Sequence, residues 1–246
     1  MVDGARRTVV ATFYAPGEWP ERVVLDESAS HHATVKRLAV GDSVRLTSGD
    51  GRRVHGSIAV LGKGRLEVDC EHASLERVPA PPHVVLWAPV GDRDRMLLLA
   101  EKAVELGASS WRSIVYRRSR NVTPRGEGDA FREKLRRRMV AALEQAGAAW
   151  LPTIEPEAEA LGAIASGVHG HAIVLDTFGA PIVDVLAEVH EPLVIACGPE
   201  GGFEPAERAA FDDRGWRAAS VGPNVLRFET AGIAGLVLAR ALMKTT

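Results

Sequence analysis

The stretch Leu193–Gly202 reads LVIACGPEGG, an apolar run that leads into a glycine-rich turn. A second stretch of the same kind, Ala218–Ala231, reads AASVGPNVLRFETA. Each apolar run predicts a buried strand, and each turn leads into a helical pattern. Glycine lets the main chain approach a bound molecule closely, and a helix that begins after the turn offers unpaired N–H groups. The two loops therefore predict one ligand site made largely of backbone.

A tight turn without a ligand is the alternative interpretation of either loop alone. The second loop, however, carries Arg227, Glu229 and Thr230 within four residues. This concentration of polar side chains favours chemistry over a plain turn. Neither a GxGxxG motif after the first strand of this region nor a Gly-Lys-Ser/Thr motif occurs, so a nucleotide-like ligand would be bound in another way.

Strands and helices alternate in the larger, C-terminal part of the sequence. This part follows Pro79-Ala80-Pro81-Pro82, because consecutive prolines stiffen the chain and continue neither a sheet nor a helix. The predicted strands are Val84–Ala88, Ile114–Tyr116, Ala172–Leu175, Leu193–Cys197 and Ala218–Val221, and the predicted helices are Met96–Leu106, Ala130–Ala146, Pro205–Arg214 and Glu229–Met243. The alternation predicts an α/β fold with a parallel sheet, whose ligands lie beyond the C-terminal ends of the strands.

Apolar runs separated by turn residues fill the N-terminal part of the chain. Strands are predicted at Val23–Leu25, Val44–Thr47, Ile58–Leu61 and Leu66–Val68, with a short helix over residues 30–38. Closely spaced hairpin signals of this kind favour a small β-barrel. We therefore predict two domains, residues 1–78 and residues 79–246.

The composition is that of a globular protein with a substantial core, since 46% of the 246 residues are hydrophobic. The two cysteines, Cys70 and Cys197, belong to no CxxC or Cys/His cluster, so neither a disulfide framework nor a metal site is predicted. No apolar stretch is long enough to span a bilayer and no signal-peptide pattern opens the sequence. These features predict a cytoplasmic protein without membrane contact.

Charge is unevenly distributed, although the formal net charge is only −2. Ten basic and three acidic residues lie between Arg112 and Arg138. A solvated helix face explains most runs of this kind, and a surface that attracts nucleic-acid phosphates is the alternative.

The sequence resembles the 16S rRNA uracil-N3 methyltransferases, a family of the SPOUT class of S-adenosylmethionine-dependent enzymes. The resemblance covers nearly the whole chain and includes residues 31–38, Gly41-Asp42, Glu101–Gly107, Arg118-Ser119, Glu144-Gln145, Gly198–Gly202 and Leu226–Ala231. It implies a PUA-like β-barrel followed by an α/β domain tied in a trefoil knot, an exception to the rule of unknotted chains. It also implies a homodimer that acts on 16S rRNA or on the small ribosomal subunit.

The resemblance further implies that S-adenosyl-L-methionine lies bent in the knot, with its adenine held by three loops. The corresponding residues are Leu175, Asp176, Thr177, Gly198, Pro199, Gly201, Gly202, Ser220, Val221, Gly222, Asn224 and Leu226. Main-chain groups would hydrogen-bond the adenine, while Leu175, Val221 and Leu226 would form the apolar walls that a flat ring requires.

The implied reaction, methylation of N3 of a specific uridine, requires a base and a cation. Uracil N3 carries a proton and is a poor nucleophile, so the proton must leave and the resulting negative charge must be stabilised. We expect Arg227 to stabilise this charge, and Glu200 or Glu229 to assist deprotonation or to hold Arg227 in place. The alternative for the glutamates is structural, with Glu200 capping the next helix and Glu229 bracing Arg227.

Contacts to RNA phosphates are expected from His31, Lys36 and Arg37 in the first domain and from Arg118 and Arg120 in the basic run. For His31 alone, an ordinary surface side chain is the stronger interpretation. Because N3 lies on the Watson–Crick edge, the target base must arrive unpaired or extruded.

The chain departs from the charges that the family usually carries at Ala11, Thr12, Val90, Arg117 and Ala148. Fewer cations would weaken the binding of RNA unless Arg6, Arg7 and Arg117 compensate. Three alternatives remain open: a SPOUT methyltransferase for another rRNA or tRNA site, a non-catalytic RNA-binding assembly factor, and a metabolite-binding regulator without RNA. The joint presence of Glu200, Arg227 and Glu229 favours an enzyme.

Overall fold

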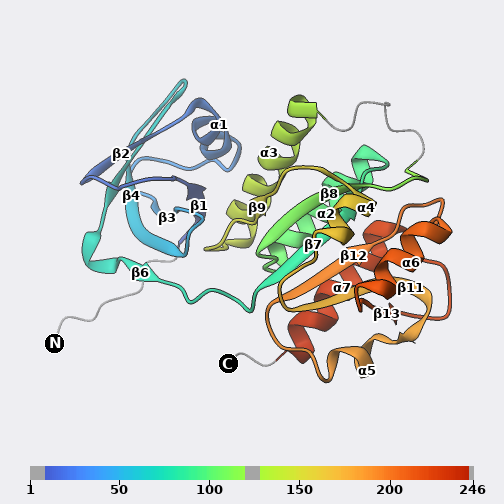
Figure 1. Cartoon of the computed structure of the whole chain (residues 1–246). Coiled ribbons are helices and arrows are strands. Elements are labelled where there is room, and N and C mark those ends of the chain that lie inside the picture. The colour runs from blue at the N-terminus through green and yellow to red at the C-terminus, as the bar shows by residue number, and fades with distance from the viewer. Residues whose placement is uncertain (1–8, 120–127, 244–246) are drawn as a thin grey trace. The chain divides into compact units, whose positions relative to one another are not determined.

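The computed structural model describes residues 9–119 and 128–243 (Figure 1). The chain divides into two compact units. Unit 1 comprises Met1–Ala80 together with Leu143–Leu151, and unit 2 comprises Pro81–Ala142 together with Pro152–Thr246. The fold is mixed α/β, with an N-terminal, mainly antiparallel sheet in unit 1 and a parallel sheet in unit 2.

Unit 1 is built on one sheet. Its elements are β1 (Ala11–Tyr14), β2 (Arg22–Leu25), α1 (Glu27–Val35), β3 (Ser43–Thr47), β4 (Arg52–Gly62), β5 (Arg65–Cys70), the 3-10 helix η1 (His72–Ser74) and β6 (Glu76–Arg77). The strand order is β1-β3-β4-β5-β2, with β1 parallel to β3, the other neighbours antiparallel, and β6 paired with β4. The four predicted strands are present, whereas β1 and the two-residue β6 were not predicted.

The two faces of this sheet have different roles. Phe13, Val44, Leu46 and Val54 point into one core and are fully buried, and α1 covers part of it. Side chains alternate between the faces along a strand, so Thr12, Arg45 and Thr47 lie on the opposite face.

The segment Leu143–Leu151 completes unit 1. The Glu144 carboxylate accepts a hydrogen bond from the Tyr14 N–H (2.9 Å) and lies 3.2 Å from Nδ1 of His32. Burial raises the pKa of Glu144, while the Tyr14 N–H and His32 act in the opposite direction. The Thr47 hydroxyl donates to the carbonyl of Ala148 (3.0 Å). The segment thus satisfies polar groups that would otherwise be buried without partners.

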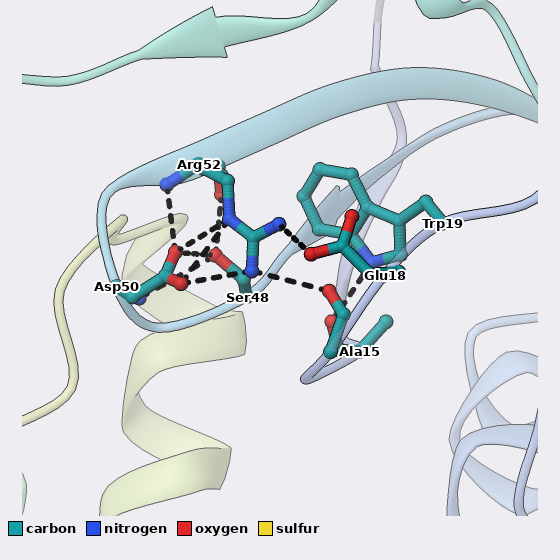
Figure 2. Close-up of polar contacts among 7 residues, drawn as sticks. Ala15, Glu18, Trp19, Ser48, Asp50 and Arg52 are labelled. Carbon is teal, nitrogen blue, oxygen red and sulfur yellow. Dashed lines mark hydrogen bonds and ion pairs between the residues drawn. The ribbon is translucent and has the colours of Figure 1, made fainter.

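A cluster of polar contacts surrounds Arg52, where the turn between β3 and β4 ends (Figure 2). Its guanidinium donates to the Asp50 carboxylate (2.8 Å) and to the carbonyl of Gly17 (3.2 Å), and it pairs with Glu18. It also lies 5.6 Å from the centre of the Trp19 ring. Hydrogen bonds from Arg52 hold the pKa of Asp50 well below its usual range. Arg52 therefore has acceptors for most of its donors within the unit.

Unit 2 alternates strands and helices as predicted. Its elements are β7 (Val84–Pro89), α2 (Arg93–Glu105), β8 (Ser110–Val115), α3 (Gly128–Ala146, whose last turn belongs to unit 1), β9 (Thr153–Ile154), β10 (Ala158–Glu159), α4 (Ala160–Ala165), β11 (His171–Pro181), α5 (Ile182–Leu186), β12 (Leu193–Cys197), α6 (Pro205–Asp213), β13 (Arg217–Ser220) and α7 (Phe228–Leu242). The parallel strands follow the order β10-β8-β7-β12-β11-β13, with β9 paired to β8. In the described chain, no helix is long and apolar enough to cross a membrane.

The strand β11 runs further than predicted. The apolar run ends at Leu175, but the strand continues to Pro181, and its register against β13 shifts between Leu175 and Ala180. Within this irregular part, a Cβ atom on Gly179 would lie 2.4 Å from the backbone nitrogen of Ala219. The two backbones therefore touch at a point where no side chain fits.

Gly51 provides a test of the packing in unit 1. Its φ is +95°, and an added Cβ would lie 2.4 Å from Cζ2 of Trp150. We predict that Gly51→Ala lowers the free energy of unfolding by about 2–5 kcal/mol, since backbone strain and overpacking add. Gly64→Ala is the control, because its φ is also positive but nothing lies within 4 Å; it should cost about 1–2 kcal/mol. Urea unfolding followed by tryptophan fluorescence measures both, and equal losses would contradict the packing argument.

Candidate functional site

One cavity lies at the C-terminal edge of the unit 2 sheet. In this sheet Leu175 pairs with Cys197 of β12 on one side and with Ala219 of β13 on the other. At this level β12 ends at Cys197, β13 is one residue from its end at Ser220, and β11 enters the irregular stretch that continues to Pro181. The cavity holds about 230 Å³ and is lined by Leu175, Asp176, Thr177, Gly198, Pro199, Gly202, Phe203, Arg208, Ser220, Val221, Gly222, Asn224, Val225, Leu226, Phe228 and Ala231.

Most of the predicted cofactor residues line this cavity. The exception is Gly201, which packs against Arg118: an added Cβ would lie 2.8 Å from Cβ of Arg118. Sequence reasoning missed Phe203, Arg208, Val225, Phe228 and Ala231. The spacing of Phe228 and Ala231, three residues apart on α7, was the available signal for one face of that helix.

Apolar walls and a folded-back loop shape the cavity. Leu175, Phe203 and Phe228 are almost completely buried, whereas Val225 is 87% exposed. The loop after β12 turns tightly, since a Cβ on Gly198 would lie 2.7 Å from the Phe203 ring and the N–H of Gly202 donates to the carbonyl of Pro199 (2.8 Å). The Gly198 position therefore has room for backbone alone.

The polar side of the cavity is formed by Asp176 and Arg208. The Asp176 carboxylate accepts a hydrogen bond from the Phe178 N–H (3.1 Å) and forms an ion pair with Arg208. The guanidinium of Arg208 also lies 5.5 Å from the centre of the Phe203 ring. These contacts hold one carboxylate and one guanidinium at fixed places beside apolar walls. The Ser220 hydroxyl, by contrast, donates to the carbonyl of Gly222 in its own loop (3.0 Å).

The two candidate glutamates converge on a residue that was not predicted. Arg95, in the first turn of α2, forms an ion pair with Glu200, and its Nε lies 3.8 Å from Oε1 of Glu229. In this structure neither glutamate pairs with Arg227. The cap of α6 is not Glu200 either, because a capping box of Glu204 and Glu207 occupies that position. Instead of pairing with residues nearby in sequence, Glu200 and Glu229 both lie against Arg95, which is more than one hundred positions earlier in the chain.

The two carboxylates differ in exposure. The Glu200 side chain is 50% exposed, whereas that of Glu229 is 9% exposed and its Oε2 has no hydrogen-bond partner in the described structure. Arg227 is the N-cap residue of α7 and is exposed. Within the described residues its side chain makes no hydrogen bond or ion pair, so the guanidinium is available to a ligand.

The predicted RNA-contact residues lie in both units. His31, Lys36 and Arg37 are exposed at α1 and just beyond it, and Arg37 has a positive φ of 57°. In unit 2, Nε of Arg118 donates to Glu204 (2.6 Å) and Nη1 donates to the carbonyl of Gly201 (3.2 Å), so part of this guanidinium is already engaged. Arg120 lies outside the described residues.

Two buried side chains of unit 2, Cys197 and Tyr116, have raised pKa values. Burial raises the pKa of the Cys197 thiol to about 12. Burial also raises the pKa of Tyr116 well above its usual value, with Cys197 and Glu207 contributing. Because the thiolate is the reactive form of cysteine, the buried, protonated Cys197 serves as a small apolar residue.

Comparisons with known proteins agree with this architecture. The family model of an RNA methyltransferase domain matches residues 78–240, and that of an RNA methyltransferase PUA domain matches residues 25–70. Ribosomal RNA small subunit methyltransferase E from Mycobacterium bovis is 30% identical over 230 residues, which cover 87% of this chain and 84% of the relative.

Two solved structures share the fold. A methyltransferase from Legionella pneumophila, solved in complex with the bound cofactor SAM, has a TM-score of 0.84 at 25% identity and covers 95% of this chain and 98% of its own. A ribosomal RNA small subunit methyltransferase E from Neisseria gonorrhoeae has a TM-score of 0.83 at 22% identity, with the same coverage. The predicted family membership is confirmed, and the chain belongs to the RNA methyltransferase family that includes ribosomal RNA small subunit methyltransferase E.

Proposed function

We propose that this chain transfers a methyl group from S-adenosyl-L-methionine to N3 of one uridine in the 16S RNA of the small ribosomal subunit. The family membership supports RNA methyl transfer, and the curated relatives act, by name, on the RNA of the small subunit. The observation that carries the proposal is the cavity at the C-terminal edge of β12, β11 and β13, lined by all but one of the residues that the resemblance assigns to the cofactor.

In this proposal the cavity holds the methyl donor. Leu175, Val221 and Leu226 contact the adenine, and main-chain groups of the Gly198–Gly202 and Ser220–Leu226 loops hydrogen-bond its edge. Asp176 and Arg208 face the polar part of the ligand. When bound, S-adenosyl-L-methionine supplies an electrophilic methyl group on a sulfonium centre.

The protein's own residues prepare the base. The N3 proton must leave while negative charge develops on the uracil oxygens. Arg227 adjoins the cavity residues Leu226 and Phe228, and its unpaired guanidinium stabilises this charge. Glu200 accepts the proton because its carboxylate is accessible, whereas the buried Glu229 acts through Arg95 to hold Glu200 in position.

The finer architectural features belong to the same proposal. The trefoil knot is part of the proposal through the resemblance to the family. Phe178 and Val225, which are 89% and 87% exposed, are apolar surface beside the cavity that a second copy of the chain would cover, which supports a homodimer. The proposal also comprises a functional division into residues 1–78 and 79–246, a PUA-like barrel in the first of them, a reaction without a metal and a cytoplasmic location. In this division, unit 1 binds RNA through Lys36 and Arg37 and unit 2 contributes Arg118.

The direct test is methylation of RNA by the purified chain. Small ribosomal subunits or 16S rRNA, incubated with the chain and with isotopically labelled S-adenosyl-L-methionine, should gain one label, which mass spectrometry should locate at N3 of a single uridine. A label at another atom, or in tRNA alone, would contradict the proposed target. Cofactor binding without any transfer would favour an assembly factor.

Arg227 tests the mechanism. We predict that Arg227→Ala lowers the methylation rate by about 10²–10³-fold, the usual loss when one donor to a developing oxyanion is removed. The dissociation constant for S-adenosyl-L-methionine, measured by calorimetry, should stay nearly unchanged, because this side chain is exposed at the edge of the cavity. A parallel loss of cofactor affinity would instead assign a structural role to Arg227.

Gly198 tests the location of the cofactor. We predict that Gly198→Ala weakens the binding of S-adenosyl-L-methionine by roughly 10- to 100-fold, since the added Cβ pushes against Phe203 and displaces the loop. Gly162→Ala is the matched control, because Gly162 has open space around it and lies outside the cavity. Unchanged affinity in Gly198→Ala would place the cofactor elsewhere.

A further inference from the structure

Three arginines in unit 1 lie close together in sequence and differ in their partners. Arg52 and Arg53 are neighbours on β4, so their side chains leave opposite faces of the sheet. Arg52 is held by Asp50, Glu18 and the carbonyl of Gly17 (Figure 2). Arg53 lies on the other face with Arg45 of β3, because Arg53 pairs with Thr47 and Arg45 pairs with His55. The two side chains are thus diagonal neighbours.

Arg45 and Arg53 have fewer acceptors than Arg52. Nε is buried in both residues and has no hydrogen-bond partner in the described structure. Arg53 donates one Nη2 hydrogen bond to the carbonyl of Gly147, and the nearest recorded carboxylate, that of Glu76, is 3.8 Å away. Among the described residues, Arg45 makes no hydrogen bond or ion pair. Arg52 shows how the same side chain is satisfied when the protein itself supplies the acceptors.

The electrostatics of this pair are unfavourable without a further anion. Burial lowers the pKa of Arg53, neighbouring Arg45 lowers it further, and Glu76 opposes both. Two like charges, partly removed from water, lie near Gly147 at the end of α3. The carbonyls at that helix end attract cations, which explains the bond to Gly147. That role occupies one donor of Arg53 and leaves Arg45 without a partner.

We infer that Arg45 and Arg53 form a phosphate-binding site for the RNA backbone on unit 1, distinct from His31, Lys36 and Arg37. A guanidinium presents a planar set of N–H donors that matches the oxygens of a phosphate. Two neighbouring guanidinium groups can therefore donate to both free oxygens of one backbone phosphate. The inference rests on the proposed function, in which RNA is the substrate. RNA carries one phosphate per nucleotide and so offers the anion that this site would bind. Thr12, the register partner of Arg45 on β1, is buried and uncharged, so β1 brings no carboxylate to Arg45 at this position.

The test is RNA binding as a function of salt. A fluorescein-labelled single-stranded RNA of about twenty nucleotides and purified bacterial small subunits serve as probes, without cofactor. We expect Arg45→Gln and Arg53→Gln each to weaken binding by about three- to tenfold at low salt and to reduce the slope of log affinity against log salt by about one. Arg22→Gln, which removes a half-exposed arginine already paired with Asp69 and Glu67, should change neither value appreciably.

Further measurements separate the possible outcomes. The Arg45→Lys, Arg53→Lys double variant should recover most of the salt slope, because it keeps both charges. Thermal unfolding of every variant should resemble that of the wild type; a loss of stability with an unchanged slope would show a helix-capping role and overturn the inference. Binding of inorganic phosphate at this pair without an effect on RNA would also overturn it. RNA binding is measured without methyl transfer. The role of Arg45 and Arg53 can therefore be judged even if the chain does not catalyse the proposed reaction.

Discussion

The parallel register of β12, β11 and β13 is the constraint on which the site depends. Leu175 is paired on both sides, so the irregular part of β11 after it and the loops after β12 and β13 begin close to one level of the sheet and enclose one cavity. A slip of one residue would move every side chain of a strand to the opposite face. The absence of a side chain at Gly179 permits the backbone contact with β13 that holds this register. The position of the cavity is therefore a property of the main chain before any functional side chain is considered.

The sequence contained most of the fold, because the apolar runs of buried parallel strands and the glycine-rich turns are local signals. Leu193–Cys197 and the loop after it illustrate this, since strand, turn and helix follow in the predicted order. The elements that escaped prediction were short or irregular, such as β1 and the continuation of β11 past Leu175. Their structure depends on partners elsewhere in the chain.

The same distinction applies to the site. Residues in the strand-to-helix loops could be identified by position, and most of them line the cavity. Arg95 and Arg208 could not, because each acts on a carboxylate far away in sequence: Arg95 on Glu200, and Arg208 on Asp176. The expected pairing of Arg227 with Glu200 or Glu229 was inferred from their proximity in sequence. In the structure, Arg95 lies against both carboxylates instead. Partner choice for long charged side chains is a tertiary property, which a single sequence does not encode in any local pattern.

The segment Leu143–Leu151 has a consequence for how this protein could evolve. It lies in the middle of the chain, yet it supplies Glu144 and the Ala148 carbonyl to partners in the N-terminal sheet. A gene fragment that ends at the proline-rich linker would lack this segment and would leave the Tyr14 N–H and the Thr47 hydroxyl without their acceptors. Recombination therefore cannot exchange unit 1 as one continuous piece of the gene, because this unit is encoded in two separate segments. An exchange of this unit must carry both pieces together, which ties the history of the N-terminal sheet to that of the C-terminal part of the chain.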